Sequence, residues 1–149
     1  NQNQLINNLK TKNNMGQILD AAKYKVMYFA ADPDSDGVFN QALNLYAAPV
    51  SAFRGFNMET SSGTTQIYLY FEPQRMSGLD TGNDQNAYDR VLLNIATNKH
   101  KEVMAGIIQA INGDGPKSTG FIVIADDMNN KYASSHITSI QSITQTEPA

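Results

Sequence analysis

One stretch of the chain, from Tyr88 to Asp127, restricts the possible folds more than any other, because it predicts a strand, a helix and a second strand. Apolar side chains alternate with other residues over 90–96, which indicates a strand with one buried face. Over 99–112 they recur every three or four positions, which predicts an amphipathic helix. The unbroken apolar run 121–125 is typical of a strand covered on both faces near the centre of a sheet.

The sequence also predicts where this helix begins and ends. Thr97 or Asn98 is expected to cap its start with a side-chain oxygen. The pair Asn112 and Gly113 predicts its end, since glycine reaches the left-handed conformation without steric cost, and Pro116 prevents the helix from resuming.

The order of the two strands around the helix stays open at this point. A right-handed crossover would make them parallel neighbours, whereas the connection after the helix is long enough for the helix to lie across an antiparallel sheet. The other strands are joined by hairpins. We therefore predict an α+β fold with a mostly antiparallel sheet of about six strands, on which the helix 99–112 packs.

Four further segments have the composition of strands. Residues 24–29 are dense in β-formers, and residues 52–58 and 65–71 flank a glycine-containing loop, which predicts a hairpin. In the second hairpin strand the tyrosines share one face and are expected at a half-wet surface. The isoleucines of 136–144 are three apart, which fits no regular strand and indicates a bulge.

Two segments between the strands have less regular patterns. Residues Val38 to Tyr46 are expected to form a short helix that ends at Pro49, because Val38, Ala42 and Tyr46 share a helical face. Residues 74–86 form a long polar loop, and loops of this length in compact domains are usually functional or mobile.

Length and composition favour one domain. A chain of 149 residues can bury a core of its own. We expect a polar, amide-rich N-terminal arm over 1–17, a single α+β domain over 18–146 and a short tail over 147–149. The arm has too few apolar residues to bury much surface, although it could become ordered on a neighbouring subunit.

Charge and cysteine usage exclude several function classes. The net charge of −3 and the scattered Lys and Arg residues argue against nucleic-acid binding. No run approaches the ~18 apolar residues of a membrane span. The absence of cysteine excludes disulfide scaffolds, thiolate zinc sites and thiol nucleophiles.

The segment Asp32 to Gly37, Asp-Pro-Asp-Ser-Asp-Gly, matches the opening of a calcium-binding loop. In such loops alternate carboxylates (here Asp32, Asp34 and Asp36) converge on the ion, and the glycine permits a sharp turn. The twelfth position is Leu43, where the bidentate glutamate of an EF-hand would stand. The favoured interpretation is therefore a solvated acidic turn without metal, with calcium binding as the alternative.

Candidate catalytic groups are few. The histidines are His100 and His136, and no nucleophile elbow, metalloprotease motif or P-loop accompanies them. His100, between two lysines at the helix start, is expected to be exposed. Asp126 and Asp127 follow the predicted central strand, which is the best position for a catalytic carboxylate in an open sheet, and serve equally well as a polar strand end.

Two segments resemble anion sites. Lys99, His100 and Lys101 at a helix start could grip an anion, although such clusters are usually only tolerated there. The segment 113–117 resembles a phosphate loop superficially, since it follows a helix rather than a strand.

The strand arginines and the aromatic residues have structural explanations. Arg54 and Arg90 need partners, for which Asp89, Glu72 and Glu59 are the candidates. The side chains Phe53, Phe56, Tyr68 and Tyr70 are expected in the core or at an interface.

Three runs of sequence resemble small virion structural proteins of tailed phages, particularly marine ones. These runs are Leu69–Pro73, Thr97–Met104 and Gly120–Asp127, and the resemblance covers roughly Ala52 to Ile143. It implies a protein that is assembled many times on a particle, and it assigns no functional residues.

The leading hypothesis is therefore a non-enzymatic structural subunit of a tailed-phage virion, such as a capsid decoration or head-associated protein. We expect it in the virion, in contact with the major capsid protein and copies of itself, without nucleic acid, membrane or cofactor. The alternative is a secreted or surface-exposed binding module with calcium at Asp32–Gly37. A third hypothesis is a small enzyme that uses Asp126 or Asp127 with His136.

Overall fold

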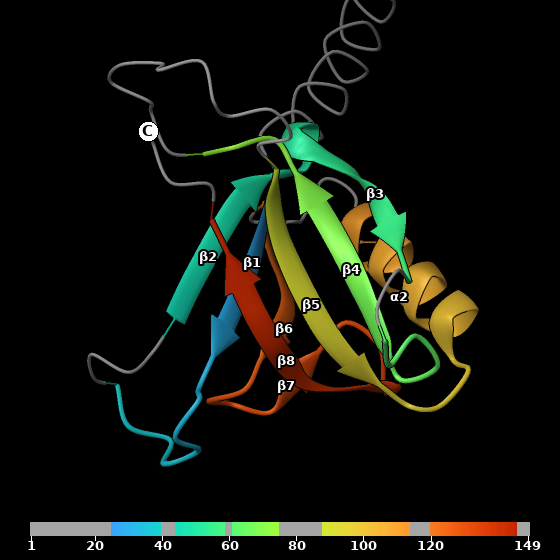
Figure 1. The fold of residues 1–149 in the computed structure, drawn as a ribbon. Coiled ribbons are helices and arrows are strands. Elements are labelled where there is room, and N and C mark those ends of the chain that lie inside the picture. Colours follow the sequence, from blue (N-terminus) through green and yellow to red (C-terminus); the bar gives the residue numbers. More distant parts are fainter. Residues whose placement is uncertain (1–24, 40–43, 59–60, 75–87, 114–119, 146–149) are drawn as a thin grey trace, which may run out of the picture.

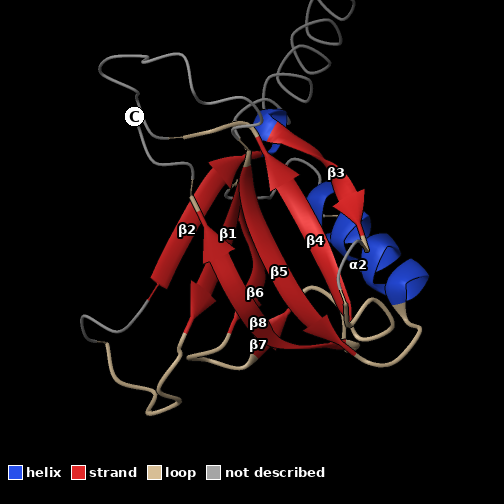
Figure 2. Cartoon of the chain, viewed as in Figure 1, coloured by secondary structure: helices blue, strands red, loops and turns tan. Residues whose placement is uncertain are grey.

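The computed structural model describes residues 25–39, 44–58, 61–74, 88–113 and 120–145 (Figures 1 and 2). The elements are β1 (Val26–Ala31), β2 (Asn44–Pro49), the 3-10 turn η1 (Val50–Ala52), β3 (Phe53–Asn57), β4 (Gln66–Phe71), β5 (Asp89–Ile95), α2 (His100–Asn112), β6 (Phe121–Asp126), β7 (Lys131–Tyr132) and β8 (Ile137–Thr144). The predicted arm 1–17, the tail 147–149 and nearly all of loop 74–86 lie outside the described residues. The predicted domain boundaries therefore stay predictions.

The strands form two four-stranded sheets. The first sheet has the order β2-β1-β6-β7 and the second sheet the order β3-β4-β5-β8. β1 and β6 run parallel, and the other neighbours are antiparallel. A mostly antiparallel α+β fold was predicted and is found, but the single sheet of about six strands is wrong. The reason is that β5 and β6 belong to different sheets, so α2 passes from one sheet to the other.

The two sheets pack face to face around one core (Figure 1). Phe71 of β4 lies near its centre, with its ring centroid 5.7 Å from that of Phe29 in β1 and 5.4 Å from that of Phe53 in β3. The fully buried large side chains include Met27, Phe29, Ile67, Leu69, Phe71, Val91, Leu93, Val103, Ile107 and Ile124. Each such side chain stabilises the fold by about 1.5–3 kcal/mol relative to exposure.

Helix α2 covers one side of this core, as predicted from its apolar stripe. Val103, Ile107 and Ile111, spaced by four, are its buried residues. Gly106 allows close approach to the chain after β7, because a Cβ there would lie 2.9 Å from the Cβ of Ser134. Within the described residues, no helix has the length and apolarity that crossing a membrane requires.

The start of α2 is held differently from the prediction. Lys99 occupies the N-cap position and no side chain caps the helix. Asn98 does not cap the helix with its side chain, and its backbone adopts a left-handed φ of 62°. The expected exposure of His100 is also wrong, because its half-buried ring places Nε2 2.6 Å from the carbonyl oxygen of Gly63 and 3.0 Å from that of Gln66. Since carbonyls only accept, Nε2 carries the hydrogen and ties the helix to the β3–β4 hairpin.

Helix α2 ends at Asn112, as predicted, but the expected left-handed conformation of Gly113 is wrong. Gly113 has a φ of −79°, in the right-handed helical region. The carbonyl of Ile111 instead accepts a hydrogen bond from the Nζ of Lys25 at 2.6 Å, and this lysine is itself buried. A cation at this place also complements the partial negative charge of a helix C-terminus.

The short helix predicted over Val38 to Tyr46 is wrong at both of its described ends, and its residues 40–43 lie outside the described residues. Asn44–Pro49 is strand β2, which pairs antiparallel with β1, and Val38 and Phe39 are not helical. Tyr46 faces the core whereas Leu45 is exposed, so pairing with β1 overrides the helical spacing.

The other strand predictions are confirmed in their main points. β3 and β4 form the predicted antiparallel hairpin, and the pairing of β8 with β5 has two register shifts, as the isoleucine spacing indicated. β6 is central, between β1 and β7. Its expected coverage on both faces is wrong at Phe121, which is 54% exposed.

A buried carboxylate lies inside the core. Asp89 is fully buried, and its Oδ2 accepts hydrogen bonds from the Tyr46 hydroxyl at 2.7 Å and from the backbone N–H of Gln74 at 3.0 Å. Burial and the hydrogen bond to Asp89 both raise the pKa of Tyr46. The hydroxyl therefore stays protonated. Its hydrogen bond to Asp89 connects β2 of the first sheet to β5 of the second.

We expect Tyr46→Phe to lower the free energy of unfolding at pH 7 by about 1–3 kcal/mol, because a buried carboxylate loses a donor. Unfolded tyrosine ionises near pH ~10, whereas folded Tyr46 keeps its proton, so the parent loses stability above that pH. Tyr46→Phe lacks this loss. Above that pH, the difference in free energy of unfolding between the parent and the variant should therefore narrow by about 1.4 kcal/mol per pH unit.

Urea denaturation at pH 8 and pH 11 measures this difference. Tyr68→Phe on the half-exposed outer face is the matched control and should change stability by less than about 0.5 kcal/mol. Equal stability of Tyr46→Phe and the parent at pH 8 would contradict the role of the hydroxyl.

Candidate functional site

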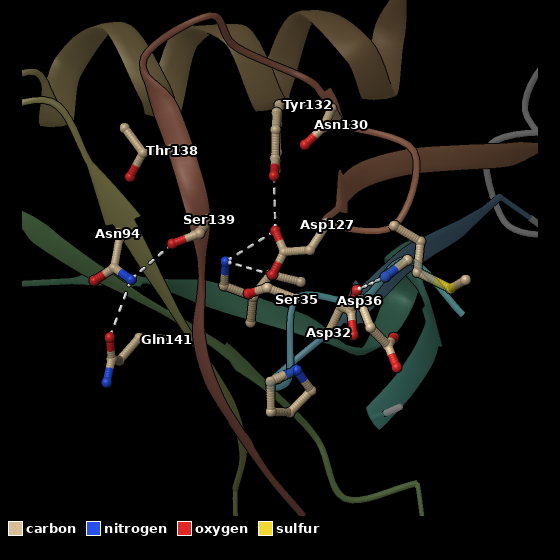
Figure 3. A pocket seen from close by; sticks show the side chains of 14 residues that line it. Asp32, Ser35, Asp36, Asn94, Asp127, Asn130, Tyr132, Thr138, Ser139 and Gln141 are labelled. Carbon is tan, nitrogen blue, oxygen red and sulfur yellow. Dashed lines mark hydrogen bonds between the residues drawn. The ribbon is translucent and has the colours of Figure 1, made fainter. Parts of the chain in front are cut away.

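A cleft of about 650 Å³ opens at one end of the two sheets (Figure 3). Its walls come from the loop after β1, the turn between β6 and β7, and parts of β5 and β8. The lining residues are Asp32, Pro33, Ser35, Asp36, Gly37, Asn94, Asp127, Met128, Asn130, Tyr132, Thr138, Ser139, Ile140 and Gln141. Most of these side chains carry hydroxyl, amide or carboxylate groups, so the cleft is suited to polar ligands or cations.

The parallel pairing of β1 and β6 creates this cleft. The carboxyl ends of parallel strands meet at the same edge of a sheet, where ligands commonly bind. The loop from Asp32 and the turn from Asp127 therefore begin side by side, and the backbone N–H of Asp127 donates to the carbonyl of Ala30 at 2.9 Å.

The loop Asp32–Gly37 is folded around its first carboxylate. Oδ2 of Asp32 accepts a hydrogen bond from the N–H of Gly37 at 2.9 Å, and its carbonyl accepts one from the N–H of Ser35 at 3.1 Å. Ser35 and Gly37 both have positive φ, at 55° and 67°, which turns the chain back on itself. One carboxylate oxygen from each of Asp32, Asp34 and Asp36 then lies within 4.8 Å of the others.

Asp126 and Asp127, the predicted candidates for catalysis, hold the β6–β7 turn. Oδ1 of Asp126 accepts hydrogen bonds from the N–H groups of Met128 and Asn129, and Oδ2 accepts one from the Asn129 side chain. Asp127 accepts from the N–H of Ile140 at 3.1 Å and from the Tyr132 hydroxyl at 2.8 Å (Figure 3). Asp127 thereby joins the turn to β8.

His136, the histidine of the enzyme hypothesis, forms hydrogen bonds through its backbone. The N–H of His136 donates to the Ser134 hydroxyl and its carbonyl accepts from Ala96. In the described part of the chain, no hydrogen bond joins the His136 ring to Asp126 or Asp127.

Two tyrosines near these carboxylates have raised pKa values. Burial is the main cause for Tyr132, followed by its hydrogen bond to Asp127, and burial followed by the charge of Asp126 raises the pKa of Tyr28. Both hydroxyls therefore remain protonated, and Tyr132 acts as a donor rather than as a base.

An amide network forms the opposite wall. Nδ2 of Asn94 donates to the Ser139 hydroxyl at 2.9 Å and to Oε1 of Gln141 at 3.0 Å, and Gln66 donates to Oδ1 of Asn94 at 3.1 Å. This network links β4, β5 and β8 across the second sheet. Sequence reasoning did not single out these residues, and only strand register brings them together.

His100, Arg54 and Arg90 are not among the residues that line the cleft. His100 of the lysine cluster is turned to carbonyl oxygens rather than to an anion, and most of the segment 113–117 lies outside the described residues. Arg54 forms the predicted ion pair with Glu72. Arg90 places its guanidinium 5.9 Å from the centre of the Tyr68 ring.

We expect Asp127→Ala to lower the free energy of unfolding by about 1–3 kcal/mol, because the Ile140 N–H and the Tyr132 hydroxyl lose their acceptor. Asp127→Asn should lose less, since one carbonyl oxygen remains. Chemical denaturation measures both variants beside Glu102→Gln, an exposed control on α2. Unchanged stability of Asp127→Ala would show that the carboxylate does not hold the turn.

Comparison of the chain with models of protein families, with characterised proteins and with solved structures finds no match.

Proposed function

We propose that this protein is a non-enzymatic structural subunit of a tailed-phage virion, a capsid decoration or head-associated protein that acts through repeated protein–protein contacts. The observation that carries the proposal is the apolar, partly exposed outer face of the first sheet. Surfaces of this kind on a soluble domain usually mark a contact with another protein.

This outer face is built by strand alternation. Met27 and Phe29 of β1 point into the core, so Val26 and Tyr28 point outward. Phe121 lies beside Val26 on β6 and is 54% exposed, with its ring centroid 5.0 Å from that of Tyr28. The outward residues of the three strands are Val26, Tyr28, Leu45, Ala47, Phe121 and Val123.

The edge of the same sheet extends this surface. β2 is the terminal strand of the first sheet, and Leu45 on it is 40% exposed. In the loop before β2, Val38 and Phe39 are 54% and 73% exposed. An edge strand beside apolar side chains favours association with another chain through backbone and side-chain contacts together.

Burial of this surface would stabilise an assembly by about 25 cal/mol for each Å² of apolar area removed from water. The resemblance to small virion proteins implies that this assembly is a phage particle. In it, the major capsid protein or another copy of this chain would cover the face. The proposed location is accordingly the virion.

A second candidate function is a secreted or surface-exposed binding module. The polar cleft between the Asp32–Gly37 loop and β8 favours it, because ligand sites concentrate polar groups in a concave surface. In that case the protein would act without incorporation into a particle.

The test is mass spectrometry of purified particles of the phage that encodes the chain. We expect the parent protein to be present and the variants Phe121→Ser and Leu45→Ser to be lost from the particles, because each removes an apolar contact of the outer face. Tyr88→Ser, which changes an exposed aromatic residue outside this face, is the matched control and should be incorporated.

Absence of the parent from the particles would refute the proposal and leave the binding module. Incorporation of Phe121→Ser and Leu45→Ser at the level of the parent would show that the outer face is not the contact.

A further inference from the structure

We propose that the loop Asp32–Gly37 is a calcium site, in which the carboxylates of Asp32, Asp34 and Asp36 bind the ion at the edge of the cleft. This inference does not rest on the proposed virion function, because calcium binding is measured on the isolated chain and incorporation is measured on the particle.

The first argument is convergence of charge. The three carboxylates present one oxygen each within 4.8 Å of the others, and the side chains of Asp34 and Asp36 are exposed. Figure 3 shows Asp32 and Asp36 side by side at the cleft. Like charges at this separation repel one another, and a divalent cation among them reverses the sign of the interaction.

Within this cluster, Asp32 differs from the other two carboxylates because it is buried. Asp32 is only 8% exposed, and its Oδ1 is buried without any hydrogen-bond partner. Its other oxygen, Oδ2, accepts from the N–H of Gly37, which fixes the direction of the carboxylate. Burial of an ionised oxygen without a partner is unfavourable, and such groups are normally paired or coordinate a metal.

The described surroundings supply no cation of the protein's own. Within the described residues, no ion pair reaches Asp32, and the pair found there joins Arg54 to Glu72. A metal ion is therefore the partner that would satisfy Oδ1 and neutralise the cluster.

The ligand chemistry selects calcium. Carboxylate oxygens at alternate positions, followed by a glycine with positive φ, are the arrangement in which calcium loops bind their ion. Calcium accepts irregular sets of six to eight oxygens, whereas magnesium requires near-ideal octahedral geometry. Since Leu43 supplies no closing carboxylate, we expect a dissociation constant of roughly 10⁻⁴–10⁻³ M, the range of extracellular calcium modules.

The test is thermal unfolding of the full chain with EDTA, calcium or magnesium. At calcium ten times above its dissociation constant, we expect the melting temperature of the parent to rise by roughly 3–6 °C. Asp34→Asn and Asp32→Asn should lose this rise, whereas Glu102→Gln, an exposed acidic residue of α2, should keep it.

Asp32→Asn also gives a second readout. In EDTA it should melt at or above the temperature of the parent, because it removes a buried charge and keeps an acceptor for Gly37. In calcium the parent should melt at a higher temperature than Asp32→Asn, because only the parent binds the ion. If Asp32→Asn does not fold, as judged by circular dichroism, the exposed Asp34→Asn carries the test.

A direct measurement uses terbium in place of calcium. The chain has no tryptophan, so excitation near 280 nm is absorbed by tyrosine, and Tyr132 lines the same cleft. We expect sensitised terbium emission that calcium displaces and that Asp34→Asn lacks. No calcium-dependent rise in the parent, an equal rise in Asp34→Asn, or an equal rise with magnesium would each overturn the assignment.

Discussion

β1 and β6 are the parallel pair of the described fold, and their pairing determines how its other parts meet. A parallel pair needs a long connection, and here the chain between the two strands builds β2, β3, β4, β5 and α2 before it returns. Docking of β6 beside β1 adds Ile122 and Ile124 to the core between the sheets. The same docking brings the Asp32 loop and the Asp127 turn to one edge, where the cleft forms.

Buried polar groups connect the parts that this topology separates. Lys25 holds the end of α2, His100 holds its start, and Asp89 joins Tyr46 of the first sheet to the backbone beyond β4. In each case a buried charged or polar atom has a partner, as stability requires. Oδ1 of Asp32 is the exception among these groups, because it is buried without a partner. We therefore interpret the other polar groups as structural and the Asp32 loop as a ligand site.

The two functional surfaces therefore have different origins within one sheet. The outer face of β2, β1 and β6 is apolar because both faces of these strands carry apolar residues and only one face lies against the core. The cleft is polar because it is built from loop residues and from the strand ends of β5 and β8. The carboxylates of the cation site and the apolar side chains of the contact surface are different residues, but the two surfaces adjoin at Val38, whose backbone N–H donates to Asp36.

Sequence alone determined those features that depend on neighbours along the chain. Val103, Ile107 and Ile111 show the buried stripe of α2, the segment before and after Gly63 shows the hairpin, and Asp32 to Gly37 shows the converging carboxylates. Tertiary structure decided whatever depends on distant partners. Two sheets formed in place of one because β6 pairs with β1 rather than with β5, and β2 became a strand because β1 offered hydrogen bonds that outweighed helical spacing. Burial of Asp32, exposure of Phe121 and the roles of His100 and Asp127 follow from packing between remote segments, which no local pattern records.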